Sequence, residues 1–371
     1  MPNPTAMKLL LIALLASVAC QKQIDPEGDS IRLNYLSRSE AVQVLGREDQ
    51  HARSLSRFSM EALLGRKDAT AADYLAFAAE QALDWDAGQQ KTVEQCVNEL
   101  NRTIRRKGLK LPFPESINII TSSLAEEGGA GGYTRGTTVV LSRDLLEQAP
   151  VSVIKTVVAH EVFHVLTRND PDFRRKMYAL IGFEVLPRSV ELPDGLKDYV
   201  IDNPDVNAHD HCAVFTIGGK RRNCMLLLYS KTDYTGGYYY WDYFSTGLLE
   251  IDPQSYLPVL EDGQYRLYSI DDAADFYDQV GDNTEYTIDP EEILVYFSAD
   301  NLIAATNTTH LYIYSPHDRQ EFKYKKQGNA LQLVTGEDST FYVMKKYCFS
   351  TLQSAEYLVK EHKTVNKANG Q

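Results

Sequence analysis

The sequence predicts an α+β protein, and three observations support this prediction. In residues 39–108, leucine, alanine and valine recur among charged residues at helical spacing. Residues 116–121 and 137–141 are rich in β-branched side chains, which favour strands. Residues 186–288 are rich in tyrosine, aspartate and glycine and contain short alternating segments. We therefore expect a helical and sheet core over residues 39–185, followed by a β-rich insertion over residues 186–288.

The composition is that of a globular protein with an acidic charge balance. Of the 371 residues, 43% are hydrophobic and 24% are charged. The chain contains 38 Lys and Arg against 51 Asp and Glu, which gives a net charge of −13. An acidic chain repels phosphate backbones, and no local basic patch offsets this repulsion. The sequence therefore predicts no nucleic-acid partner.

The N-terminal segment has the pattern of an export signal. Lys8 precedes the apolar run Leu9–Ala19, whose eleven residues are about half of what a membrane-spanning helix needs. Cys20 follows directly and resembles the cysteine of the bacterial lipobox, which is lipidated after cleavage. This resemblance implies a signal peptide over residues 1–19 and a lipid-anchored tether over residues 20–38.

The same resemblance implies where the protein acts. Acyl chains on Cys20 would attach the protein to a membrane. Gln21 in the next position favours, by resemblance, the outer membrane of a Gram-negative cell. We therefore expect an exported bacterial lipoprotein of the cell envelope, facing the periplasm or the cell surface.

Two helices are expected between the second predicted strand and the insertion. The first opens at Pro150 and stops before Pro171, and the second ends at Gly182. Pro290 starts a further helix after the insertion. We assign residues 289–371 to this helix and a C-terminal region.

The first of these helices contains the sequence His160-Glu161-Val162-Phe163-His164. Two histidines four positions apart project from nearly the same helix face, which lets both imidazoles reach one tetrahedral zinc ion. Glu161 lies beside the first histidine, where its carboxylate can take a proton from zinc-activated water. A buried cluster of this kind without a metal would be costly. The pattern predicts that His160 and His164 bind Zn²⁺ and that Glu161 is the general base.

Residues 156–164 resemble the active-site helix of the zincin metallopeptidases. The resemblance covers about residues 116–185, plus one helix further along the chain. It implies a mixed sheet with an edge strand just before the active-site helix, against which an extended peptide substrate pairs. Residues 133–141 are expected to form that strand. The resemblance thus implies hydrolysis of peptide bonds in a peptide or protein substrate.

Two glutamates compete for the role of third zinc ligand. Thr167 and Asp170 occupy the glycine and histidine positions of the metzincin extension, so a gluzincin-like glutamate is implied instead. Glu184 follows the second histidine at the thermolysin-like interval but stands at an expected helix end. Glu292 opens an apolar helix, and its surroundings resemble a segment of some bacterial zinc peptidases. We expect Glu292 to be the ligand, and we interpret Glu291 as favourable helix N-terminal charge.

The group that stabilises the oxyanion is left open among three residues. Gluzincins commonly use a downstream histidine or tyrosine for this role, and His209, His211 and Tyr199 are the candidates. The competing interpretation is a polar turn with surface histidines. The aromatic run over residues 238–244 is expected to be a strand with one face in the core, with a ligand groove as the alternative.

Four cysteines follow Cys20, and none belongs to a zinc-binding pattern. An exported compartment permits disulfides. Cys212 and Cys224 flank eleven residues that suit a hairpin. We expect a disulfide between these two cysteines.

Taken together, these patterns predict a zinc-dependent metallopeptidase of the cell envelope. Its metal ligands would be His160, His164 and Glu292, and its general base Glu161. The aromatic run supports an alternative from another class. That alternative is a cell-surface binding or scaffold lipoprotein without turnover, in which the zinc site is vestigial.

Overall fold

The protein has an α+β fold, as the sequence predicts. The computed structural model describes residues 30–107, 110–206, 208–236, 240–280 and 287–294, and strands at 310–315, 320–327, 330–335 and 338–342. The expected signal peptide and Cys20 lie outside the described residues. The lipid anchor therefore stays a prediction.

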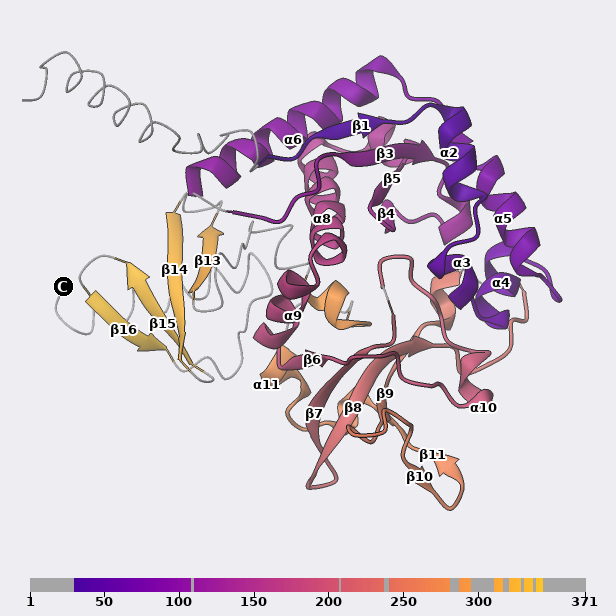
Figure 1. Cartoon of the computed structure of the whole chain (residues 1–371), viewed down its shortest axis with the longest axis vertical. Coiled ribbons are helices and arrows are strands. Elements are labelled where there is room, and N and C mark those ends of the chain that lie inside the picture. Colours follow the sequence, from indigo (N-terminus) through magenta and orange to yellow (C-terminus); the bar gives the residue numbers. More distant parts are fainter. Residues whose placement is uncertain are drawn as a thin grey trace, which may run out of the picture.

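A mixed five-stranded sheet organises the N-terminal part of the described chain (Figure 1). Its strands are β1 (Leu33–Tyr35), β2 (Ala82–Leu83), β3 (Ile117–Ser122), β4 (Gly132–Arg135) and β5 (Thr138–Ser142). Both β1 and β5 run parallel to β3, whereas β2 pairs antiparallel with β3 and β4 antiparallel with β5. The strand order β1-β3-β5-β4 leaves β4 at an edge. The strand β1 lies within residues 20–38, which were expected to be a tether.

The expected edge strand over residues 133–141 is a hairpin rather than one strand. The chain turns between β4 and β5 at Gly136, whose φ is +62°. Glycine adopts this left-handed conformation without the steric cost that a Cβ would bring. The turn makes β4 the edge strand and places β5 inside the sheet.

Helices cover both faces of this sheet. In the first part of the chain they are α2 (Arg38–Leu45), α3 (Gln50–Ser54), α4 (Arg57–Leu64), α5 (Ala71–Glu80), α6 (Ala87–Lys107) and α7 (Arg143–Gln148). Side chains of α2, α4 and α5 pack with Ile120 and Val140 on one face. Side chains of α6 and of a later helix, α8, pack with Ile119 and Val139 on the other face. Neighbouring positions of a strand point to opposite faces, and the burial of both explains the continuous apolar runs in β3 and β5.

The helix with the two histidines, α8 (Val151–Asn169), and the next helix, α9 (Pro171–Leu180), begin and end close to their predicted bounds. Asp170 separates them, and its side chain accepts hydrogen bonds from the backbone N–H groups of Asp172 and Phe173 at the start of α9. Gly182, with φ +77°, follows α9 in the left-handed conformation. These local signals fix where α8 stops and how its motif faces the rest of the fold.

A second sheet, entirely antiparallel, lies below the first in Figure 1. Its order is β12-β9-β8-β7-β6, and its strands are β6 (Phe183–Val185), β7 (His211–Ile217), β8 (Lys220–Tyr229), β9 (Ser245–Glu250) and β12 (Leu267–Ser269). Phe215 and Leu226 of this sheet pack with Phe163 of α8, Met177 of α9 and Ile293. The motif helix therefore lies between the two sheets. Most strands of the second sheet fall within residues 186–288, and β6 precedes that range.

Several short elements complete the described part of the chain. They are η1 (Ala125–Glu127), α10 (Asp194–Lys197), η2 (Tyr240–Tyr243), β10 (Leu260–Glu261), β11 (Gln264–Tyr265), η3 (Ile270–Asp272) and α11 (Phe276–Val280), together with a helical turn at residues 290–294. A separate antiparallel sheet consists of β13 (His310–Ser315), β14 (Gln320–Gln327), β15 (Ala330–Thr335) and β16 (Asp338–Tyr342). None of the described helices combines the length and apolarity needed to cross a membrane.

The predicted disulfide between Cys212 and Cys224 is wrong. Both cysteines are buried and free. Cys224 is paired across the ladder with Ala213, the neighbour of Cys212, so the two thiols point to opposite faces of the sheet. Cys224 accordingly packs in the core beneath α9, whereas Cys212 packs with Leu186 and Met225 on the other side. The hairpin was expected correctly, but its register separates the two sulfur atoms.

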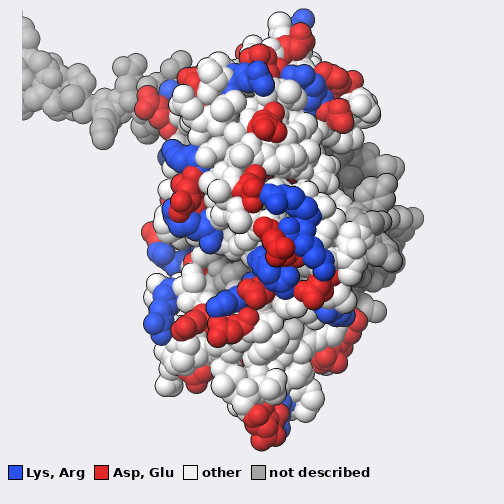
Figure 2. Space-filling view, turned by 90° about the vertical axis from the view of Figure 1, so that its right-hand side faces the viewer, with Lys and Arg blue, Asp and Glu red and all other residues white. Residues whose placement is uncertain are grey.

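The surface turned toward the viewer in Figure 2 carries basic and acidic side chains in close alternation. Ion pairs among the described residues include Arg57 with Asp233 at 2.8 Å and Arg66 with Asp73 at 2.6 Å. Mixed charge of this kind gives this face no continuous basic surface for a polyanion.

Candidate metal and catalytic site

The helix α8 brings both histidines and the glutamate of its motif to one place. Its apolar residues Val158 and Val162 pack against the first sheet, which anchors the helix. His164 and Glu161 are almost fully buried, with 0% and 1% of their surface exposed, and the side chain of His160 is 20% exposed. The motif thus faces the interior and opens to solvent only at His160.

The helical turn at residues 290–294 supplies the third side chain. Glu292 Oε2 lies 3.5 Å from His160 Nε2, and Glu292 Oε1 lies 3.8 Å from His164 Nε2. One ligand atom from each of these three residues lies within 4.8 Å of the others. Asp289 starts the turn by accepting a hydrogen bond from the Glu291 backbone N–H at 2.8 Å. Of the two glutamates in competition, Glu292 is the one that the fold brings to the histidines.

The donor atoms of this trio fit a bound cation. Two ligands of a tetrahedral zinc ion, each about 2.1 Å from it, lie about 3.4 Å apart, and the Glu292–His160 distance of 3.5 Å is close to that value. The buried atoms His164 Nε2 and Glu292 Oε2 make no hydrogen bond to any of the described residues. Buried polar atoms without partners are rare and costly, and a metal ion would satisfy both. These side chains can therefore hold a metal ion.

The orientation of His164 is fixed by Glu291. Glu291 Oε1 lies 3.2 Å from His164 Nδ1 and also accepts a hydrogen bond from the Thr167 hydroxyl. Its Oε2 accepts a hydrogen bond from the Tyr178 hydroxyl at 2.9 Å. With Nδ1 donating to this carboxylate, Nε2 points toward Glu292 and is free to donate its lone pair to a metal. Glu291 is therefore more than the helix N-terminal charge predicted from the sequence.

The electrostatic field around His164 favours a cation. Burial by itself opposes charge on the imidazole, but the carboxylates of Asp205, Glu291 and Glu292 outweigh burial and raise the His164 pKa to about 10. At His160, burial together with the neighbouring His164 lowers the pKa of the imidazole. The field that favours a proton on His164 Nε2 also favours a metal cation there.

Glu161 is held against the edge strand β4. Its Oε2 accepts a hydrogen bond from the Thr134 hydroxyl at 2.8 Å. Burial and the nearby Asp205 carboxylate raise its pKa well above the ordinary value. A Cβ atom added to Gly132 would lie only 3.1 Å from Glu161 Oε1, so glycine makes room for this carboxylate. Glu161 thus lies beside the trio as an oriented, poorly solvated carboxylate.

A loop over residues 201–206 closes the other side of the site. Asn203 donates a hydrogen bond to Glu292 Oε1 at 2.8 Å, and Asp205 Oδ1 lies 3.9 Å from His164 Nε2. Asp205 Oδ1 also accepts a hydrogen bond from the Thr134 backbone N–H at 2.6 Å. Glu161, His164 and Asp205 form a second group whose ligand atoms lie within 4.8 Å of one another. Asp205 is therefore a further carboxylate within reach of a bound cation.

The three residues considered for the oxyanion do not line the cavity at this site. Tyr199 donates a hydrogen bond to Asp233 at 3.0 Å on the surface. His211 Nε2 lies 2.8 Å from the Leu226 carbonyl oxygen, and His209 lines a smaller neighbouring pocket. The polar turn that contains His209 does approach the metal ligands, but through Asn203 and Asp205. Glu184 is exposed on β6, away from the histidines.

A cavity of about 400 Å³ opens beside the trio. One wall is the edge strand with its preceding turn, and the opposite wall is the loop over residues 201–206. Tyr240, Trp241 and Phe244 also line the cavity. Residues 240–243 form the 3₁₀-helix η2, so the strand expected over residues 238–244 is wrong for this described part. The rings pack on one another instead of alternating across a sheet, with centroids of Trp241 and Phe244 4.9 Å apart.

Sequence reasoning missed Glu291, Asp205 and Thr134. Glu291 is assigned a different role from the sequence, and Asp205 belongs to the polar turn that contains His209. The distance of both residues from the motif along the chain hides their contact with it. Thr134 has no pattern of its own. The signal that could have pointed to it is its place on the expected edge strand, since that strand was assigned next to the motif helix.

Comparison with family models, with curated proteins and with solved structures finds no match for this chain. The geometry of the site is therefore the basis for assigning a function.

Proposed function

We propose that the protein is a zinc-dependent metallopeptidase. The observation that carries this proposal is the convergence of His160, His164 and Glu292 beside the buried Glu161, at the wall of a cavity. Two nitrogen donors and one carboxylate are the ligand set of many catalytic zinc sites, which keep their remaining position for water or substrate. The proposal also agrees with the resemblance to zincins. The mixed sheet supports this resemblance, because an antiparallel edge strand of the sheet lies beside the motif helix.

Zinc, when bound, would polarise the carbonyl group of a peptide and lower the pKa of water. His160 and His164 would hold it through Nε2, and Glu292 through its carboxylate. Glu161 would accept a proton from the attacking water and deliver it to the leaving amine. Thr134 would keep the Glu161 carboxylate in place for both transfers, because its hydroxyl donates to Oε2.

The edge strand β4 offers a backbone on which a peptide can dock. The main-chain groups of Thr134 point away from β5. Its N–H donates a hydrogen bond to Asp205, and its carbonyl accepts one from Arg168 at 2.7 Å. Because every second residue of an antiparallel strand points the same way, the N–H and carbonyl of Gly132 also face away from β5. Gly132 lines the cavity. An extended substrate would add to the sheet there and pass in front of Glu161.

The cellular setting belongs to the same proposal. A lipid on Cys20 would place the peptidase at the bacterial cell envelope through its acyl chains. Its substrates would then be peptides or proteins of that compartment.

Purified protein tests the function directly. We expect about one zinc per chain by elemental analysis, and cleavage of a mixed peptide library that stops when a chelator removes the metal and resumes with added zinc. The exposed variant Glu115→Gln serves as a control for handling and folding. Zinc without cleavage would favour the binding or scaffold lipoprotein. Absence of zinc would contradict the enzyme.

A further inference from the structure

The cavity beside the proposed metal site has a second polar end. Besides the site residues, it is lined by Glu127 and Asp202, which come from η1 and from the loop over residues 201–206. Both are buried, with 4% and 8% of their surface exposed. No lysine or arginine occurs among the described residues that line the cavity. Charged groups at this end are therefore negative.

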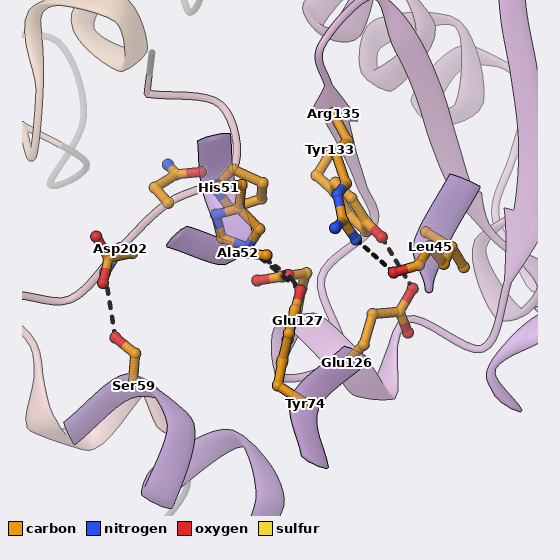
Figure 3. A network of polar contacts seen from close by, with 12 residues as sticks. Leu45, His51, Ala52, Ser59, Tyr74, Glu126, Glu127, Tyr133, Arg135 and Asp202 are labelled. Atoms are coloured by element: carbon orange, nitrogen blue, oxygen red, sulfur yellow. Dashed lines mark hydrogen bonds and ion pairs between the residues drawn. The ribbon is translucent and has the colours of Figure 1, made fainter. Parts of the chain in front are cut away.

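Glu127 keeps one carboxylate oxygen available. Its Oε1 lies 3.1 Å from His51 Nε2 and also accepts a hydrogen bond from the Tyr74 hydroxyl (Figure 3). Both of these contacts are made by Oε1, and 5% of the side-chain surface is exposed. Because Glu127 lines the cavity, its Oε2 can accept a hydrogen bond from a ligand there.

Asp202 adds a second carboxylate from another segment. Its Oδ2 accepts a hydrogen bond from the Ser56 backbone N–H at 2.7 Å, and its own backbone N–H donates to Ser59 at 3.2 Å. Figure 3 shows it on a separate segment from Glu127, across from the His51 side chain. Burial raises the Asp202 pKa to about 7, so a nearby cation would stabilise the ionised form.

Aromatic rings complete this end of the cavity. Tyr240 packs on Phe244 with ring centroids 5.2 Å apart, and the Trp241 indole N–H donates to the Gly128 carbonyl at 3.1 Å, next to Glu127. The Tyr240 hydroxyl is buried without a hydrogen-bond partner among the described residues. Aromatic faces attract ammonium and guanidinium groups, and most strongly in desolvated places. The rings also cover the apolar stem of a long side chain.

We infer that this end of the cavity is a specificity pocket for a lysine or arginine side chain of the peptide substrate. This inference rests on the proposed peptidase function and names its substrate class. The carboxylates of Glu127 and Asp202 would accept hydrogen bonds from the cationic head, and the rings of Tyr240 and Phe244 would cover its stem. A peptide docked along β4 would place such a side chain in the same cavity as the scissile bond.

Two sets of end-blocked hexapeptides test the pocket. Each position in turn carries either lysine or norleucine, which has a similar stem without the charge. For the unmodified chain we expect lysine at one position to raise the cleavage rate about tenfold over norleucine. In Glu127→Gln combined with Asp202→Asn the ratio should fall toward one, whereas Glu115→Gln should keep it. Equal rates for lysine and norleucine at every position would overturn the pocket but leave the peptidase standing.

Binding separates the pocket from turnover. Zinc-loaded Glu161→Gln, which should not cleave, is titrated calorimetrically with the same peptides, and we expect about tenfold tighter binding of the lysine peptide. If no peptide is cleaved but this preference appears and disappears with the two acid substitutions, the pocket is right and the peptidase is wrong. If the double variant does not fold, Tyr240→Leu replaces it, and an unchanged lysine preference in that variant would overturn the role of the rings.

Discussion

His164 Nδ1 lies 3.2 Å from Glu291 Oε1, although 127 positions separate the two residues along the chain. The contact joins the motif helix to the turn that carries Glu292. It selects the tautomer in which Nε2 faces the other candidate ligands. Because Tyr178 and Thr167 also donate to Glu291, the carboxylate is fully engaged and cannot rotate toward the cavity.

Glu291→Gln should weaken zinc binding by about 10- to 100-fold without unfolding the protein. Glutamine keeps the size of the side chain but loses the charge that strengthens the hydrogen bond from His164. Competition with a chromophoric chelator measures the zinc Kd. Glu184→Gln, an exposed residue of β6, is the matched control. An unchanged Kd in Glu291→Gln would show that this contact does not support the metal.

Glu292→Ala should lower zinc occupancy far more than Glu184→Ala. Glu292 lies within 4.8 Å of both histidine donor atoms, whereas Glu184 faces solvent. Zinc per chain after dialysis against a weak chelator gives the comparison. The reverse order would transfer the ligand role to Glu184. Asp205→Asn belongs in the same series, and a loss as large as that of Glu292→Ala would make Asp205 a ligand.

Features of the fold and site that depend on residues close together in the sequence could be predicted from the sequence. The bounds of α8 follow from Pro150 and Pro171, and the shared face of His160 and His164 follows from helix geometry. The metal-binding role of Glu292 was expected from its segment, and the fold brings that residue to the histidines.

Features that depend on register or on distant contacts were not predictable in this way. The disulfide between Cys212 and Cys224 failed because a shift of one position across a ladder reverses the face on which a thiol lies. Glu291 was read as helix charge because its contact with His164 exists only after the two sheets enclose α8. The aromatic residues 240–243 form a 3₁₀-helix because their rings pack on one another and on Gly128, which strand propensity does not anticipate.

Thr134→Val should lower kcat about tenfold and leave the zinc content unchanged. Valine has the shape of threonine but cannot donate to Glu161 Oε2, and the loss of one hydrogen bond to a buried carboxylate costs about 1.5 kcal/mol. KM should change less, because Thr134 would act on the base and not on the substrate. Thr103→Val on α6, whose hydroxyl donates to the Glu99 carbonyl, is the control. A change in KM alone would mean that Thr134 binds substrate.

Cys20→Ser should abolish metabolic labelling with a radioactive or clickable fatty acid and release the protein from membranes. The physical reason is that acyl chains supply the apolar surface needed for stable anchoring. The measurement is membrane fractionation and acyl labelling of cells that express either the unmodified chain or the Cys20→Ser variant. Unchanged labelling would contradict the lipobox, and it would leave the proposed peptidase activity unaffected.

Glu161→Gln separates metal binding from catalysis. Glutamine keeps the size of the side chain and can still accept the hydrogen bond from Thr134, but it cannot take a proton from water. The variant should keep its fold and its zinc and lose turnover by about 10²- to 10⁴-fold, the usual contribution of a general base. His160→Ala, in contrast, should lose zinc and activity together, because it removes a ligand. Elemental analysis and library cleavage on the same preparations give both readouts. If Glu161→Gln cleaves as fast as the unmodified chain, the proposed mechanism is wrong even with zinc bound.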